Sequence, residues 1–152
     1  MRTITRDVVS ALVISRDNKF LMGKTDPAAG GVYSGCWVIP GGGVEEGETK
    51  LEALIREMKE ETRLDISPYK HKIVEDGASG QSEKTLKDTG ERVIVHMNFF
   101  TYEIRIDLES RDIPVGTTEE LVEIKWIAGD DLSSENLAPP TVKLLKKLKY
   151  IQ

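Results

Sequence analysis

The sequence of 152 residues lacks several features that would define other classes of protein. Its single cysteine, Cys36, excludes an internal disulfide and suits a reducing compartment, so we expect a cytoplasmic protein. No apolar run is long enough to span a bilayer, and the start lacks the apolar segment of a signal peptide. Positive charge is also scarce, because 21 Lys and Arg residues stand against 26 Asp and Glu residues. A nucleic acid polymer and a membrane are therefore not the expected partners.

The composition is otherwise ordinary for a folded protein, with 39% apolar and 31% charged residues. Internal repeats and interdomain linkers are missing, so residues 1–152 are expected to form a single α/β domain. Five segments rich in β-branched or apolar residues are predicted strands: residues 7–15, 20–24, 36–40, 92–104 and 121–128.

Turn and loop signals separate these segments. Asp17-Asn18 predicts a tight hairpin between the first two strands, and a turn of three glycines, 41–43, follows the third. Residues 76–91 are polar and contain glycine, which predicts a long mobile loop. A final helix is expected at 141–150, after a pair of prolines.

A central helix is predicted to begin near Thr49, because Thr49 and Glu52 have the spacing of a capping box. Leu51, Leu54, Ile55 and Met58 fall on one side of it and form the expected core stripe.

Three glutamates of this helix, Glu57, Glu60 and Glu61, are spaced i, i+3 and i+4 and therefore crowd one side. Like charges at these spacings repel one another. Glu61 lies nearest the apolar stripe, so its carboxylate is expected to be partly desolvated, a conflict that Mg²⁺ or Mn²⁺ would remove. The helix alone favours an ordinary acidic face. The glycine-rich turn before it changes that balance, because it lets backbone groups approach a ligand closely.

Taken together, these residues match a long pattern, G-x5-E-x7-R-E-U-x-E-E-x-G-U, in which U is a bulky apolar residue. The matching positions are Gly42, Glu48, Arg56, Glu57, Met58, Glu60, Glu61 and Leu64. The chain thus resembles the Nudix hydrolase family, including its MutT-like members. Arg63 stands where the pattern has its last glycine, so we expect a changed helix exit without loss of chemistry.

The resemblance implies an α/β/α sandwich around a mixed sheet, and hydrolysis of a nucleoside diphosphate linked to another group. It implies that Glu57, Glu60, Glu61 and the carbonyl of Gly41 bind Mg²⁺, with Mn²⁺ as an alternative. By the same resemblance one of the glutamates takes the proton from water, a role that we assign to Glu57, and Arg56 and Glu48 position the carboxylates and the turn. Lys24 and Gly42 are the expected substrate contacts: Lys24 matches a basic position that meets phosphates in relatives, with a solvated lysine as the alternative. Glu119 and Glu120 are weaker candidates for a further ligand.

Segments on both sides of the pattern resemble the bacterial branch that hydrolyses pyrimidine deoxynucleoside triphosphates to the monophosphate and pyrophosphate. Relatives that read guanine use an asparagine before the last helix, whereas Ala138 or Pro139 stands there in this chain, with Asn136 slightly upstream. A nucleotide-sugar hydrolase of the GDP-mannose type and a non-catalytic nucleotide sensor are the alternatives. The expected partner is a small nucleotide, and a homodimer is left open.

Overall fold

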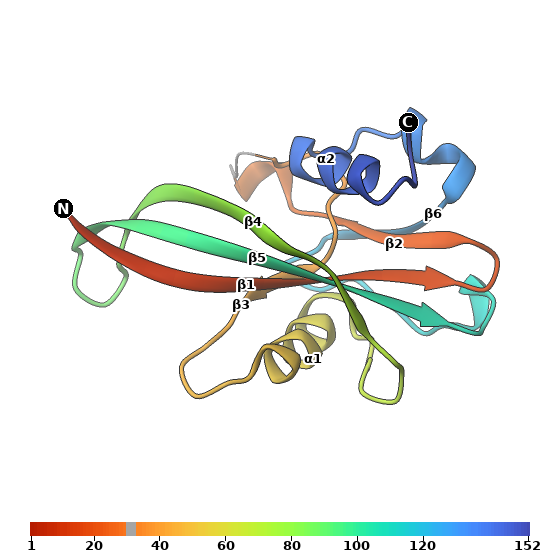
Figure 1. Cartoon of the computed structure of the whole chain (residues 1–152), viewed down its shortest axis with the longest axis horizontal. Coiled ribbons are helices and arrows are strands. Elements are labelled where there is room, and N and C mark those ends of the chain that lie inside the picture. Colours follow the sequence, from red (N-terminus) through yellow and green to blue (C-terminus); the bar gives the residue numbers. More distant parts are fainter. Residues whose placement is uncertain (30–32) are drawn as a thin grey trace.

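A mixed sheet forms the centre of the molecule and carries one helix on each face (Figure 1). The computed structural model describes residues 1–29 and 33–152. The strands of this described part are β1 (Arg2–Ser15), β2 (Lys19–Lys24), β3 (Gly41–Gly43), β4 (Lys72–Thr85), β5 (Arg92–Ile106) and β6 (Glu123–Ala128). The main path of the sheet is β4-β5-β1-β2-β6, and β3 pairs with β1 beside it. The β1 and β5 strands run parallel, whereas the other neighbours are antiparallel.

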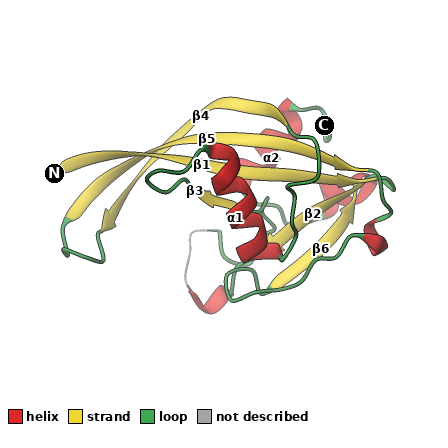
Figure 2. Ribbon diagram, turned by 90° about the horizontal axis from the view of Figure 1, so that it is seen from below, coloured by secondary structure: helices red, strands yellow, loops and turns green. Residues whose placement is uncertain are grey.

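Helix α1 (Lys50–Thr62) covers one face of the sheet and α2 (Pro139–Lys147) covers the other. Figure 2 shows α1 lying across the strands, with α2 behind them. Short 3₁₀ helices occur at η1 (Pro27–Ala29), η2 (Ser110–Asp112) and η3 (Gly129–Ser134). The predicted α/β/α sandwich with a mixed central sheet is confirmed. No helix of the described chain is both long and apolar enough to cross a membrane.

The alternation of side chains along β1 produces the two layers of the core. Val9, Ala11 and Val13 pack in the cluster under α1, while Leu12 and Ile14 pack in the cluster under α2. Successive residues of a strand point to opposite faces, so an uninterrupted apolar run belongs to a strand covered on both sides. The hairpin after β1 is confirmed, with Asn18 in the left-handed conformation at φ 56°.

The start of α1 is confirmed in detail. Thr49 Oγ1 accepts the N–H of Glu52 at 3.1 Å, and the Thr49 N–H donates to Glu52 Oε1 at 3.0 Å. Leu54 and Met58 are fully buried beneath the helix. The helix end differs from the expectation: Arg63 adopts the left-handed conformation, at φ 62°, that a glycine would take there. Its Nε donates to the Thr117 carbonyl at 3.0 Å, so a tertiary contact helps to hold it in place of the missing glycine.

The polar segment predicted as a mobile loop is a strand instead. Residues 76–85 belong to β4, which pairs with β5 from Lys72 to Thr85 and is interrupted by irregularities on either side of Glu75. The strand lies at the edge of the sheet, where one face and one side remain open to solvent, so its side chains need not be apolar. The strongly β-prone β5 supplies the pairing partner that the local sequence does not reveal.

The glycine-rich turn is also a strand. The predicted strand at residues 36–40 makes only isolated bridges, at Trp37 and Val38, whereas Gly41–Gly43 forms β3 against β1. Pro40 has no N–H to contribute to a ladder, and β1 offers free backbone groups to the glycines that follow it. Glycine is disfavoured in strands, so its presence here requires a local reason.

Candidate active site

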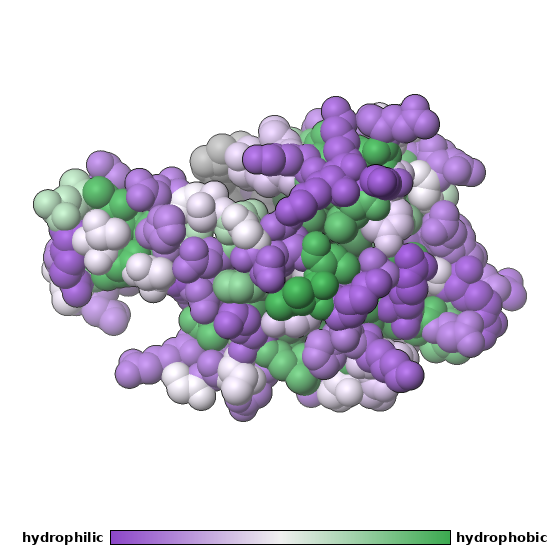
Figure 3. All heavy atoms as spheres, viewed as in Figure 1, coloured by the Kyte–Doolittle hydropathy of each residue, from purple (hydrophilic) through white to green (hydrophobic). Residues whose placement is uncertain are grey.

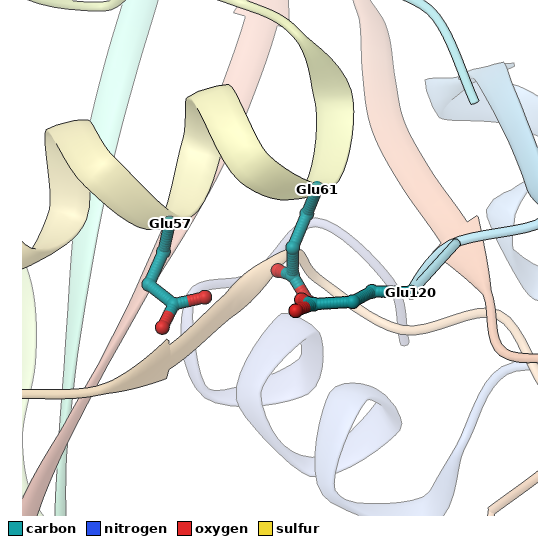
Figure 4. Close-up of side chains that lie close together, drawn as sticks. All are labelled: Glu57, Glu61 and Glu120. Atoms are coloured by element: carbon teal, nitrogen blue, oxygen red, sulfur yellow. The ribbon is translucent and has the colours of Figure 1, made fainter. Parts of the chain in front are cut away.

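Three carboxylates from two distant segments meet beside β3. Glu57 and Glu61 project from successive turns of α1, and Glu120 comes from the segment before β6 (Figure 4). One oxygen from each of the three lies within 4.8 Å of the others. Figure 4 shows Glu61 and Glu120 meeting directly, with Glu57 beside them. The cluster offers hard oxygen atoms of the kind that divalent cations prefer as ligands.

Burial perturbs two of these carboxylates. Glu57 and Glu61 are each only 9% exposed. Burial raises the pKa of Glu61 to about 8; the Gly41 N–H opposes this shift, and the charges of Glu57 and Glu120 add to it. Burial also raises the pKa of Glu57, although the Arg56 guanidinium opposes the change. The expected desolvation of Glu61 is confirmed. The positive charge near the cluster is not enough to balance its carboxylates.

The Arg56 guanidinium connects the carboxylates to the turn before the helix. Its Nε and Nη2 atoms donate to the two oxygens of Glu48 at 2.7 and 2.9 Å, a bidentate pair. Its Nη1 donates to Glu57 at 2.9 Å and its Nη2 to the Gly43 carbonyl at 3.0 Å. The Arg56 hydrogen bond lowers the pKa of Glu48 to about 2, with help from the Glu45 N–H. Both residues therefore make the bracing contacts expected of them.

Glu60, which the sequence groups with Glu57 and Glu61, lies outside the cluster. Its side chain is 47% exposed and accepts a hydrogen bond from Arg56 Nη1 at 3.2 Å. The same nitrogen binds Glu57, so Glu60 stands at the rim of the site with its charge partly neutralised. Glu120 is the third carboxylate of the cluster, although the sequence indicated it only as a weaker candidate. The pair Glu119-Glu120 was the available signal, and it does not say which of the two points inward.

Each glycine of β3 lacks room for a Cβ atom: at Gly41 it would meet the backbone of β1, whereas at Gly42 and Gly43 it would meet a side chain. A Cβ atom at Gly42 would lie 2.3 Å from the carboxyl carbon of Glu57. The Gly41 N–H donates to Glu61 Oε1 at 2.7 Å and therefore faces away from β1. In a strand the N–H and C=O of one residue point to the same side, so the Gly41 carbonyl also faces the carboxylate side. The backbone of this glycine segment lies close to the carboxylates, in a strand and not in a turn. Its approach to a ligand stays a prediction.

Lys24 lies at the end of β2 and already has partners. Its Nζ is 4.6 Å from the centre of the Trp37 ring and 4.0 Å from a carboxylate oxygen of Glu123. Its role as a phosphate contact stays a prediction.

A groove of about 1140 Å³ lies between α2 and the strands β4 and β5. Its lining includes Val8, Ser10 and Phe99 on the sheet, and Ala138 and Pro139 at the start of α2. Figure 3 shows hydrophobic side chains between α2 and the sheet on a face that is otherwise largely hydrophilic. The groove extends to Gly41 and so meets β3, the strand beside which the carboxylate cluster lies.

Asn136 does not line this groove, and its side-chain amide donates to the Gly35 carbonyl at 3.3 Å. Ala138 and Pro139, the residues that the sequence predicts at the position of the guanine-reading asparagine, do line the groove, and their side chains carry no polar group.

The sandwich, the glycine strand and the carboxylate helix define a Nudix pyrophosphohydrolase. The chain belongs to this family, because the NUDIX domain model matches residues 4–148. It is 31% identical over 146 residues to the nucleoside triphosphatase NudI of Escherichia coli O17:K52:H18, covering 93% of this chain and 94% of the relative. It is 48% identical over 54 residues to the ADP-ribose pyrophosphatase of Methanocaldococcus jannaschii, a match that covers 34% of this chain and 29% of that protein.

Solved structures confirm the fold. The Nudix hydrolase RenU of M. smegmatis superposes with a TM-score of 0.68 at 16% identity, over 96% of this chain and 85% of that one. A bifunctional NMN adenylyltransferase/ADP ribose pyrophosphatase from Francisella tularensis, complexed with AMP and a Mn ion, superposes with a TM-score of 0.59 at 21% identity. That match covers 96% of this chain and 41% of the bifunctional one.

Proposed function

We propose that this protein hydrolyses a nucleoside triphosphate to the monophosphate and pyrophosphate with the help of a divalent cation. The observation that carries the proposal is the junction at Gly41, where a groove of nucleotide size reaches the strand beside the carboxylate cluster. Ligand sites of this kind are typically about 300–1,000 Å³, so a base and a ribose can enter together. The similarity to NudI along most of both chains supports a triphosphate as the substrate.

The cluster fits a divalent cation. Three carboxylates converge within 4.8 Å, and two of them are buried without enough positive charge to balance them. Oxygen ligands of this type suit Mg²⁺ or Mn²⁺, and one structural neighbour was solved with a Mn ion. The proposed ligands are Glu57, Glu61 and the Gly41 carbonyl, with Glu120 as an addition from the structure. Glu60, which lies at the rim of the site, stays a proposed ligand only on the family resemblance.

When bound, the cation would neutralise charge on the phosphate oxygens and help to align water for attack. The chain's own residues do the rest. Glu57 would accept the proton as the water oxygen bonds to phosphorus and the bridging P–O bond to pyrophosphate breaks. Arg56 holds the Glu57 carboxylate in place through its Nη1 atom, and Glu48 fixes Arg56. Such preorganised charge is the main source of rate in phosphoryl transfer.

A pyrimidine deoxynucleoside triphosphate is the proposed substrate. Ala138 and Pro139 line the groove where guanine-reading relatives place an asparagine, so this position offers no side-chain hydrogen bond to a purine edge. A site that pairs the polar edge of one base rejects another strongly, because its own polar groups are then left unpaired. A non-catalytic sensor is disfavoured, since the buried carboxylates are all retained. A single domain over residues 1–152, a cytoplasmic location and a homodimer stay predictions.

The test compares kcat/KM for dCTP, dTTP, dUTP, dGTP, 8-oxo-dGTP, ADP-ribose and GDP-mannose at one Mg²⁺ concentration. We expect one pyrimidine triphosphate to be the best substrate, pyrophosphate to be its first product and chelation to abolish turnover. A clear preference for 8-oxo-dGTP would overturn the pyrimidine assignment, and one for ADP-ribose or GDP-mannose would replace the triphosphate. Release of orthophosphate first would contradict the proposed chemistry.

A further inference from the structure

The side chain of Arg6 on β1 rests against Gly43 on β3. A Cβ atom at Gly43 would lie 2.2 Å from Arg6 Nε and 2.3 Å from Cζ. The φ angle of Gly43 is not in the left-handed range, so its backbone does not itself demand glycine. Gly43 also lies outside the positions that the family pattern fixes. The missing side chain therefore makes room for the guanidinium of Arg6.

Arg6 carries a charge that no other described side chain balances. Arg56, Lys24 and Lys50, the other cations near β3 and the carboxylates, each have a carboxylate oxygen within 4.0 Å. Across residues 1–29 and 33–152, by contrast, Arg6 makes no ion pair and donates no side-chain hydrogen bond. A guanidinium held in position without an anion has its full set of donors available to a ligand.

The position of Arg6 places it beside the groove. Val8 pairs directly with Gly43 and lines the groove, and Arg6 lies two residues earlier on β1, on the same face of the strand. The Gly43 carbonyl binds Arg56 and faces away from β1, so the Gly43 N–H points in that direction too. A cation and a backbone donor thus meet at one glycine, roughly 7 Å along the strand from Gly41.

We propose that Arg6 binds a phosphate oxygen of the substrate's polyphosphate chain. The space left by the absent side chain of Gly43 positions the Arg6 guanidinium for this contact. This inference rests on the proposed function and names a substrate contact that the family pattern does not contain. The planar guanidinium matches the geometry of a phosphate, and a charged hydrogen bond is among the stronger ones available. The carboxylate cluster would hold the reacting end of the polyphosphate chain, and Arg6 would fix the direction of that polyphosphate chain along β3.

The first test compares Arg6→Ala with Arg2→Ala, which removes the same charge from the same strand where Arg2 pairs with Glu91. We expect Arg6→Ala to lower kcat/KM for the best nucleoside triphosphate by about tenfold or more, the loss typical of a hydrogen bond to a charged group. Arg2→Ala should stay within about twofold of the wild type. Equal rates for the two variants would overturn the proposal.

Gly43→Ala supplies a second test that leaves Arg6 in the sequence. The new Cβ atom displaces the flexible, exposed side chain of Arg6, so the fold should survive while the guanidinium moves from its position beside β3. We expect Gly43→Ala to match Arg6→Ala, and the double variant to be no worse than either single one, because both remove the same interaction. Additive losses would mean that Gly43 does not act through Arg6.

Binding of inorganic tripolyphosphate with Mg²⁺, followed by calorimetry, separates this proposal from the proposed function. We expect Arg6→Ala, but not Arg2→Ala, to weaken binding by about tenfold. If the wild type cleaved no nucleoside triphosphate, the proposed function would fail, yet this comparison would still decide whether Arg6 holds phosphate. Unchanged or undetectable binding in the wild type and both variants would count against Arg6.

Discussion

Two pairs of buried glutamates lie on opposite faces of the sheet and differ in what surrounds them. Glu57 and Glu61 on the α1 side are each 9% exposed. Glu75 and Glu103 on the α2 side are 7% and 8% exposed, so the burial is nearly the same. The pKa values nevertheless move in opposite directions: they are raised in the first pair and lowered in the second.

Hydrogen-bond partners explain why the pKa values of the two pairs move in opposite directions. Lys147 on α2 donates to Glu75, which also accepts the Gly77 N–H at 2.8 Å, and these bonds lower its pKa. Burial alone would raise the pKa of Glu103, but hydrogen bonds from the Tyr150 hydroxyl and Arg105 outweigh it. The α2-side pair therefore fastens the C-terminal segment to the sheet. On the α1 side the carboxylates are only partly balanced by Arg56, and the proposed cation would supply the remaining charge.

The largest effect is expected at Glu61. Replacing it with glutamine keeps the shape of the side chain but removes a buried ligand charge, so activity with Mg²⁺ should fall by about a hundredfold or more. The measurement is kcat on the best nucleotide, with a thermal melt to show that the fold survives. Glu52→Gln, on the solvated side of the same helix, is the control and should change little. Similar losses in both variants would mean that α1 is only structural.

Glu120 offers a smaller and sharper test, because Glu119 beside it is a matched control outside the cluster. We expect Glu120→Gln to lower kcat by about tenfold and to raise the Mg²⁺ concentration needed for half-maximal activity, since an exposed ligand is easier to replace with water. Glu119→Gln should leave the Mg²⁺ dependence unchanged. Wild-type Mg²⁺ dependence in Glu120→Gln would remove this residue from the site.

Without metal, the two pairs should respond to mutation with opposite signs. Glu61→Gln should raise Tm because it removes an unbalanced buried carboxylate, whereas Glu75→Gln should lower Tm because it breaks the contact with Lys147. Each change in the free energy of unfolding is expected to be on the order of 1 kcal/mol, which corresponds to about 2–4 °C in Tm. The Glu75 effect is no larger because its partner Lys147 is largely exposed. Differential scanning calorimetry in EDTA checks both. A drop in Tm for both variants would contradict the comparison.

The smallest effect concerns pH. The pKa of Glu48 is lowered by Arg56, so its contribution to stability is present above its ordinary value near 4.5 and is lost as pH falls toward about 2. Denaturant unfolding of the wild type and Glu48→Gln should therefore differ most near neutral pH and converge on acidification. A difference that stayed constant between pH 6 and pH 3 would show that the Glu48–Arg56 contact does not carry it.

Local patterns were enough to predict much of the fold and part of the site. The capping box at Thr49 and the apolar stripe containing Leu54 and Met58 depend only on residues three or four apart, which one helix brings together. The i, i+4 spacing of Glu57 and Glu61 works in the same way, whereas the spacing alone wrongly grouped Glu60 with them. The expected changed exit at Arg63 was wrong, because a distant carbonyl, that of Thr117, helps to hold the turn.

The sequence by itself determined the Nudix pattern, the helix that carries it and the buried position of Glu61, because each follows from short-range spacing. Only the tertiary structure decided that Glu120 and not Glu60 completes the cluster, and that the polar segment 76–85 is a strand. It also decided that Gly43 makes room for Arg6. Such contacts join residues far apart in the chain, and their free energy comes from pairing and burial that exist only once the sheet has formed.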